Sequence, residues 1–167
     1  MGLDVCGLVR RDHDDLDRAL GAMVDPRTSP KELASLLDVF RLALAVHTAS
    51  EAKLLETLLA RVTGPRTLAM LAMQTRIEHV AQRAAADALV AARPGSIAWY
   101  DAALELRVTV MDHAARAEQT RWTLEDHVPA EIQKTLAAEY ATERMRVLAS
   151  TSPIVLAQAR DKLVPAN

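Results

Sequence analysis

Apolar residues recur every three or four positions over long stretches of this chain, which is the pattern of amphipathic helices. Pro, Gly and Ser gather between these stretches and indicate breaks. β-branched runs are short and no Asn-Gly or Asp-Gly hairpin signal appears, so the pattern favours an all-α protein. We expect an up-down-up-down four-helix bundle with one or two additional C-terminal helices. The predicted helices cover about residues 3–23, 30–61, 65–92, 97–126, 130–149 and 154–163.

The breaks between the first four stretches carry recognisable signals. Ser29, Pro30 and Glu32 predict a capping box with Pro at the first helical position. Residues 63–65, Thr-Gly-Pro, end the second stretch, and Ser96 is a candidate cap for the fourth. Each signal supports a helix boundary independently of the apolar pattern.

The chain is expected to divide into a bundle over residues 1–127 and a C-terminal helical extension over residues 128–167 packed on it. The extension carries no histidine and few features beyond amphipathicity. We interpret it as a lid or an association surface, and a homodimer is one assembly that this allows.

Each of the first four predicted helices carries one histidine. His47 and Glu51 lie one turn apart on an apolar stripe of the second helix, where an unpartnered carboxylate would be costly. A metal ion shared by the pair would remove that cost, since His-x3-Glu on a helix is a natural chelating pair. The four histidines are His13, His47, His79 and His113.

The spacing of these histidines predicts that they meet. His13 and His47 are 34 residues apart, and so are His79 and His113. His47 lies about 14 residues before the break between the second and third helices, and His79 about 14 residues after it. In an antiparallel hairpin, equal distances from the turn mean equal depth. The bundle is therefore expected to bring four imidazoles to one level of its core.

Composition excludes some functions and leaves others open. The formal net charge is −2 and the signs are interspersed, which does not fit a nucleic-acid binder. The single cysteine, Cys6, cannot form an internal disulfide, which fits a reducing cytoplasm. Neither a signal peptide nor an uninterrupted apolar run of membrane-spanning length is recognisable, so we expect a soluble protein without a membrane partner.

Four imidazoles in one layer of a helical core call for a cation, because each ring nitrogen needs a partner and protonation there is penalised. Imidazole together with carboxylate suits iron, manganese or zinc rather than calcium or magnesium. The residues thus predict a transition-metal site before any family is considered.

The order of the motifs resembles the hemerythrin-like, or HHE cation-binding, domain family over about residues 3–127. The resemblance implies a non-haem centre of two iron ions with an oxo or hydroxo bridge, which binds dioxygen or reacts with peroxide or nitric oxide. It also implies four terminal histidine ligands and two bridging carboxylates. These would be His13, His47, His79, His113, Glu51 and Glu118.

The sequence departs from that family in its third helix. Many members carry two histidines there, about a turn apart, whereas this chain has only His79, with Thr75 and Arg83 one turn to either side. Leu54-Leu55 stands where many members have an aromatic-Pro pair, and aromatic residues are scarce. A position on the metal left open for an exogenous ligand would follow from the missing histidine.

Other interpretations of single residues compete with the metal site. His13 is at a distance suited to a hydrogen bond with Asp17, and His47 with Glu51 fits a surface pair. The acids at 12, 14 and 15 are expected to be a solvated run, and His127 a solvated loop residue. Methionines on apolar stripes are expected to fill the core. They include Met70, Met73 and Met111.

Three functional hypotheses follow from the sequence. The first is a module that binds dioxygen, peroxide or nitric oxide for sensing, storage or detoxification. The second is a peroxide-decomposing di-iron enzyme that uses an open position on the metal. The third is a metal-free helical interaction protein with a degenerate site. The sequence does not choose between an enzyme and a binding module.

Overall fold

The protein is all-helical in its computed structural model, which describes residues 4–62 and 66–163. For residue 67 and for residues 119–127 and 151–163, the model describes the backbone but not the side chains. The described part forms five helices and no strand. The all-α prediction is thereby confirmed. The helices are α1 (Val5–Met23), α2 (Pro30–Arg61), α3 (Arg66–Ala91), α4 (Ile97–His127) and α5 (Ala130–Leu163).

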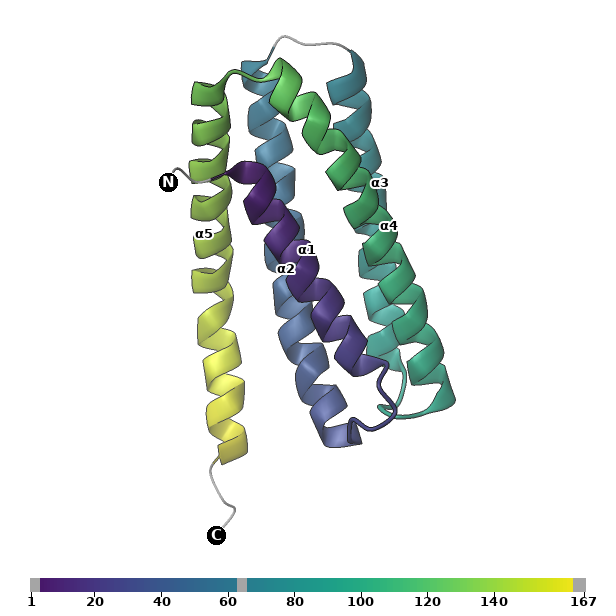
Figure 1. The fold of residues 1–167 in the computed structure, drawn as a ribbon. Coiled ribbons are helices and arrows are strands. Elements are labelled where there is room, and N and C mark those ends of the chain that lie inside the picture. Colours follow the sequence, from purple (N-terminus) through teal and green to yellow (C-terminus); the bar gives the residue numbers. More distant parts are fainter. Residues whose placement is uncertain (1–3, 63–65, 164–167) are drawn as a thin grey trace.

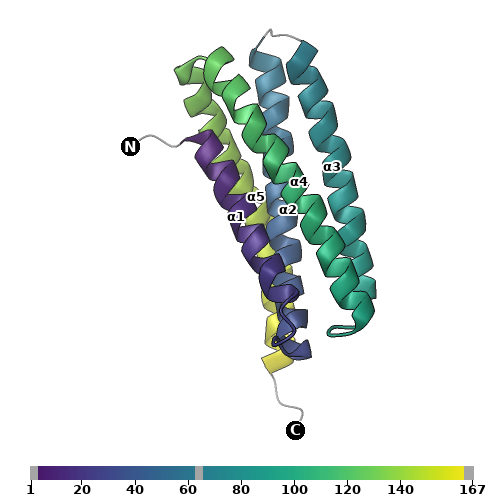
Figure 2. The ribbon, with the colours of Figure 1, turned by 45° about the vertical axis from the view of Figure 1, so that its right-hand side comes forward.

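The first four helices pack side by side around a common core (Figures 1 and 2). Within the described residues, α1 contacts α2 and α4, and α3 contacts the same two helices, while neither diagonal pair makes a close contact. The α1–α2 and α3–α4 turns lie at one end in Figure 1, and α2 leads into α3 at the other. This contact pattern is compatible with a four-helix bundle.

The predicted helix boundaries have the expected caps. Ser29 accepts from the backbone N–H of Glu32, whose side chain returns to the backbone N–H of Ser29, so the capping box is present. Ser96 Oγ accepts from the backbone N–H of Trp99 at 3.2 Å. Gly95, just before that cap, adopts φ = 81°, which glycine reaches without strain. Local chemistry alone therefore sets these turns.

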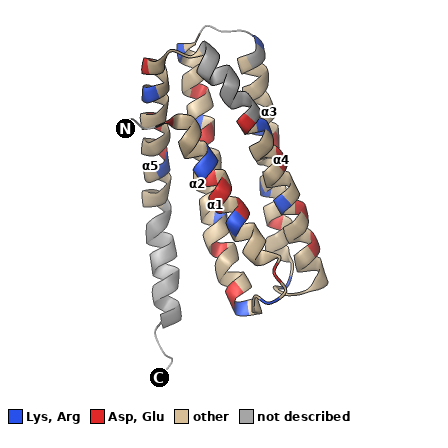
Figure 3. Ribbon diagram, viewed as in Figure 1, with Lys and Arg blue, Asp and Glu red and all other residues tan. Residues whose placement is uncertain are grey.

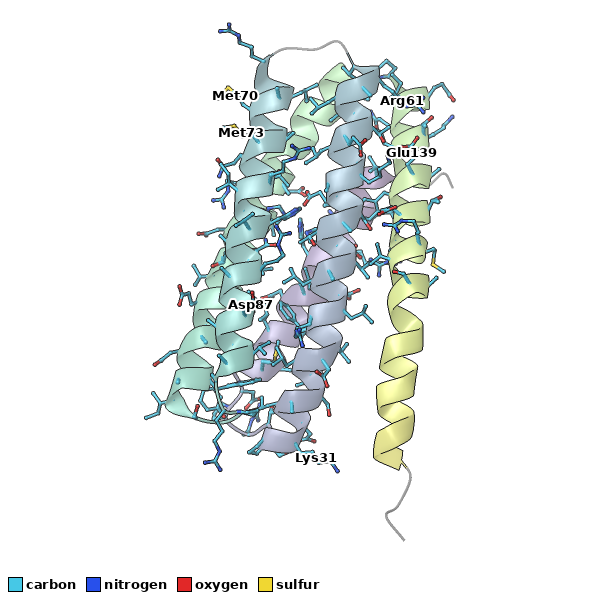
Figure 4. All side chains as sticks on the ribbon, turned by 180° about the vertical axis from the view of Figure 1, so that it is seen from behind. Lys31, Arg61, Met70, Met73, Asp87 and Glu139 are labelled. Atoms are coloured by element: carbon cyan, nitrogen blue, oxygen red, sulfur yellow. The ribbon has the colours of Figure 1, made fainter. Side chains whose placement is uncertain are left out.

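The fifth helix corrects one prediction. Residues 130–163 form one continuous helix, whereas the Ser-Pro at 152–153 predicted a break. Pro153 has no backbone N–H to donate within the helix, but the loss of this one hydrogen bond does not end α5. α5 packs mainly along α2 and also touches α1. On α2, Arg61 Nη2 pairs with Glu139 Oε1 at 3.2 Å (Figure 4).

The core consists of two separate apolar clusters. The turn-side cluster lies toward the α1–α2 and α3–α4 turns and includes Leu20, Phe40, Leu89, Trp99 and Leu106. The opposite cluster lies toward the α2–α3 connection and includes Leu54, Leu58, Leu68, Leu136 and Tyr140. On α1, α2 and α3, the histidine falls between residues of the two clusters, and on α4 His113 follows the turn-side cluster residue Val110. A polar layer is thus enclosed between two apolar ones.

Two apolar stripes run along α3, and only one of them is buried. Leu68, Ala72 and Leu89, on the stripe of His79, are buried. Met70 and Met73 are 67% and 63% exposed and point away from the bundle (Figure 4). The expectation that these methionines, together with Met111, fill the core is wrong. Both stripes have helical spacing, so only the neighbouring helices decide which one is covered.

By length and composition alone, α2 is the one described helix that resembles a membrane span. Within its most apolar window, 44% of the residues are buried in the protein, and α2 carries the buried His47 and Glu51. A core helix of a bundle has the same composition. Figure 3 shows acidic and basic residues interspersed along the described helices.

Candidate metal centre

The polar layer is built first on α2. His47 and Glu51 are 1% and 6% exposed, so the interpretation of this pair as a surface feature is wrong. Their Nε2 and Oε2 atoms are 3.5 Å apart. An uninterrupted run of Leu, Ala and Val keeps this part of α2 regular, and the one-turn spacing aims both side chains at the bundle axis.

The three other helices of the bundle each bring one imidazole to the same place. The ring centroid of His13 lies 4.6 Å from that of His47 and 5.0 Å from that of His113. The centroid of His79 lies 5.6 Å from that of His47 and 5.0 Å from that of His113. All four rings are buried. The structure therefore brings together the four histidines that the spacing predicted.

One oxygen of Glu51 is the meeting point of the cluster. Its Oε2 lies 2.8 Å from His79 Nε2 and 3.1 Å from His113 Nε2. Ligand atoms of His13, His47, Glu51 and His113 all lie within 4.8 Å of one another, which is close enough for one cation to reach them. Histidine nitrogens and a carboxylate oxygen form a donor set for a transition metal.

Some of these buried nitrogens lack a hydrogen-bond partner within the described part of the chain. Among them are His13 Nε2 and both ring nitrogens of His47. Leaving a buried polar atom unsatisfied costs about 1–3 kcal/mol. The proposed bond between His13 and Asp17 is not formed, since Asp17 accepts from Arg107 Nε at 2.9 Å. A metal ion would satisfy the orphaned nitrogens, so the residues present fit one.

Burial shapes the protonation of the cluster. Removal from water lowers the pKa of His13 to about 4 and holds the pKa of His47 well below 6.5. Burial opposes ionisation of Glu51, but hydrogen bonds from His113 and His79 hold its pKa well below the usual value. His13 and His47 therefore offer neutral imidazoles and Glu51 an ionised carboxylate, the forms that bind metals.

Glu78 is a second buried carboxylate beside the cluster, which the sequence pattern did not single out. It is 7% exposed, and its Oε2 accepts from His113 Nδ1 at 2.7 Å. Gln74 and Arg116 donate to its other oxygen. A carboxylate that holds Nδ1–H of a histidine leaves Nε2 for a metal and fixes the ring. The sequence offered one local signal for Glu78: Gln74 lies one turn before it, where its amide can donate to the carboxylate.

Both ring nitrogens of His113 face carboxylate oxygens, those of Glu51 and Glu78. Burial lowers the pKa of His113, but the bonds to Glu51 and Glu78 outweigh it and the pKa is raised. An entering metal would displace the proton on Nε2 and leave the one on Nδ1. Metal uptake should consequently release a proton from this ring.

The sixth predicted ligand lies elsewhere. Glu118 is exposed, and its carboxylate lines the rim of a cavity beside the cluster. It is not part of the group of four that lies within reach of one cation. Glu118 stands one residue beyond the same-face position for His113. Its role as a metal ligand stays a prediction, and the side chain of His127 is outside the described residues.

Behind the cluster, a buried network ties α5 to α1. Tyr140, which is fully buried, donates its hydroxyl to Asp12 Oδ2 at 2.7 Å, and Arg144 donates to Oδ1 of the same carboxylate. Asp12 is 5% exposed, so its assignment to a solvated run is wrong. Burial and the charge of Asp12 raise the pKa of Tyr140 far above 10. α5 thereby closes the bundle next to His13.

A cavity of about 470 Å³ opens beside the imidazoles. All four helices of the bundle line it, and His13, Glu51 and Glu78 form its polar end. Most of the remaining wall is apolar. A molecule in this cavity would have direct access to the donor atoms of the cluster.

Comparison of the sequence with protein-family models gave no match, and neither the curated proteins nor the solved structures gave a significant match.

Proposed function

We propose that this chain is a hemerythrin-like protein whose buried cluster holds non-haem iron and binds a small redox ligand such as dioxygen, peroxide or nitric oxide. The single observation that carries the proposal is the buried convergence of His13, His47 and His113, together with His79, around Glu51, with nitrogens of His13 and His47 left without a hydrogen-bond partner. A metal-free core would leave those atoms unsatisfied at a cost.

Iron is the metal that this donor set and the family resemblance together support. Imidazole and carboxylate suit iron, manganese and zinc alike. In the proposal, His13, His47, His79 and His113 are the terminal ligands of two ions in an up-down-up-down bundle. The carboxylates of Glu51 and Glu118 would hold the iron together with these imidazoles. When bound, iron would supply the redox chemistry and the ligand affinity that no side chain here has.

The chain itself contributes orientation and shielding. Glu78 holds His113 by its Nδ1–H, so that Nε2 faces Glu51. The turn-side cluster closes one end of the polar layer against water, while the cavity leaves the other end accessible to a small ligand. Such shielding strengthens electrostatic interactions within the site and protects reactive species from solvent. We place the protein in the reducing cytoplasm, where Cys6 stays a thiol.

A peroxide-decomposing enzyme is the second candidate, because the cavity gives an organic or inorganic peroxide an open route to the cluster. Both candidates need iron and differ in turnover. A sensor or store binds its ligand without consuming it, whereas an enzyme would evolve oxygen from added hydrogen peroxide.

We expect the iron-loaded protein to show near-ultraviolet absorption that changes on exposure to dioxygen or nitric oxide, and His47→Ala to lose it. His47 supplies a fully buried donor, so its loss should reduce bound iron severely. The measurement is iron per chain together with the absorption spectrum. His127→Ala should keep the wild-type iron content. Wild-type protein that binds no iron under iron-rich expression would contradict the proposal.

A further inference from the structure

The cavity beside the cluster is far larger than a diatomic ligand needs. It measures about 470 Å³, and ligand pockets for organic molecules are typically about 300–1,000 Å³. A dry cavity of about 150 Å³ already holds benzene. The space thus suits an organic molecule of intermediate size in addition to any gas.

The walls of the cavity indicate an elongated apolar guest. Its lining runs along α3 from Leu68 to Glu78, a rise of about 15 Å, and along α2 from Glu51 to Leu58. Val9 and Leu71 are half-buried on this lining, whereas Leu58 and Leu68 are buried. An aliphatic chain in this space would cover apolar surface at about 25 cal/mol per Å².

The rim carries a cation that is not neutralised. Arg10 lines the cavity, is exposed, and makes no ion pair or hydrogen bond with any residue in the described part of the chain. The other rim guanidinium, Arg116, donates to Glu78. An arginine beside an apolar cavity is suited to a carboxylate, which it can bind with two parallel hydrogen bonds.

We propose that the cavity binds an aliphatic carboxylate, with the head group on Arg10 and the chain along the apolar wall. The binding site belongs to the protein with or without iron. That the bound molecule lies against the iron, and is thus a substrate or modulator of that centre, rests on the function proposed above.

The test is isothermal titration of decanoate and of decanol into the metal-free protein. We expect saturable binding of both, with decanoate the tighter ligand. Arg10→Gln should weaken decanoate by about tenfold and leave decanol unchanged, because only the charge-assisted hydrogen bonds are lost. Leu71→Trp, which fills the cavity, should abolish binding of both ligands.

Leu59→Trp is the matched control, since Leu59 is 41% exposed on α2 and is not among the described residues that line the cavity. It should bind both ligands like the wild type. Three results would overturn the proposal: no saturable binding, wild-type affinity in Leu71→Trp, or decanoate binding that requires iron. The last would make decanoate a simple metal ligand. If the wild-type protein binds decanoate but takes up no iron, the proposed function is contradicted and the carboxylate site is not.

A second observation concerns the outer face of α3 and α4. Nine of the large hydrophobic side chains that are exposed in the structure lie on these two helices. Val80 and Val108 lie at equal distances from the α3–α4 turn, so the two stripes run side by side. Eight of these side chains share one outer face, whereas Val90 lies near the end of α3 on the side of the buried residues. This apolar face consists of Met70, Met73, Ile77, Val80, Ile97, Leu104, Val108 and Met111.

We infer that the apolar face joins two copies of this chain. From Met70 on α3 to Ile97 on α4, which stands level with the end of α3, the face is about 30 Å long, and two adjacent helices make it roughly 20 Å wide. That footprint of about 600 Å² approaches the ~800 Å² per partner of a stable interface. Lipid is disfavoured as an alternative, since exposed Asp101, Glu105 and Asp112 border the stripe of α4.

Sedimentation velocity at micromolar concentration should give a dimer for the wild type and a monomer for Val80→Lys with Val108→Lys. Two buried charges on each protomer would be too costly at such an interface. Val39→Lys is the control, since Val39 is 66% exposed on α2, outside the face. A wild-type monomer, with or without binding to anionic vesicles, would overturn this inference.

Discussion

Glu51→Gln is expected to remove nearly all bound iron while leaving helix content unchanged. Glu51 presents one oxygen to three imidazoles, those of His47, His79 and His113. An amide has the same shape but no charge, so it is a much weaker ligand for a transition metal. Loss of a ligand commonly costs far more than the 10- to 100-fold that second-sphere partners contribute. The measurements are elemental iron per chain and far-ultraviolet circular dichroism.

Glu56→Gln is the control on the same helix, because Glu56 is exposed and pairs with Lys53 at 3.3 Å. It should keep the full iron content. Glu78→Gln should fall between the two, since Glu78 orients His113 without joining the group of donors within reach of one cation. Iron content that is equally low in Glu51→Gln and Glu56→Gln would point to unspecific loss and contradict the assigned centre.

Acidification is expected to destabilise the metal-free protein strongly between about pH 6.5 and pH 4. Burial lowers the pKa of His13 from 6.5 to about 4, and it lowers that of His47 as well. Groups whose pKa is depressed on folding contribute stability above the unfolded pKa and lose it as the pH falls. His13 alone would account for about 3 kcal/mol of unfolding free energy.

Two other groups modify this dependence. Hydrogen bonds from the histidines keep the pKa of Glu51 low, so its contribution is also lost toward acid. The pKa of His113 is raised, which makes its contribution present below pH 6.5 and lost as the pH rises through its folded value. His113 therefore opposes His13 and His47, but two lowered imidazoles and the carboxylate outweigh it.

The check is urea unfolding of the metal-free protein at about pH 7.5 and about pH 4.5, for the wild type and for His13→Gln. The glutamine does not titrate, so the variant should show a smaller loss of unfolding free energy between the two conditions. A wild-type protein that is equally stable at both pH values would show that these imidazoles are in contact with water.

Much of the fold was available from local signals. The 3.6-residue periodicity located α1 to α4, and the capping box at Ser29 and the cap at Ser96 set two of their starts. His47 and His79 lie at equal numbers of residues from the α2–α3 connection, which predicted that they lie at equal depth. The 34-residue spacing from His13 to His47 and from His79 to His113 predicted that all four imidazoles meet. These predictions succeeded because each depends on the geometry of a regular helix and on the number of residues to a turn.

Other features depended on what each helix meets. The apolar periodicity of α3 is satisfied by two stripes, and the stripe of Met70 and Met73 is the exposed one. Glu78 is a charged residue next to His79, and it is buried because His113 and Arg116 on α4 donate to its carboxylate. Asp12 is buried because α5 places Tyr140 and Arg144 on it, from 128 and 132 residues away in the chain.

The sequence by itself determined the first four helices, the caps at Ser29 and Ser96, and the common depth of the four histidines, since periodicity and residue count are properties of a single chain segment. Only the tertiary structure decided which apolar stripe is covered, which carboxylates reach the cluster, and that a cavity opens beside it. Burial and side-chain partners depend on how two or more helices pack against each other, so the sequence of one helix does not determine them.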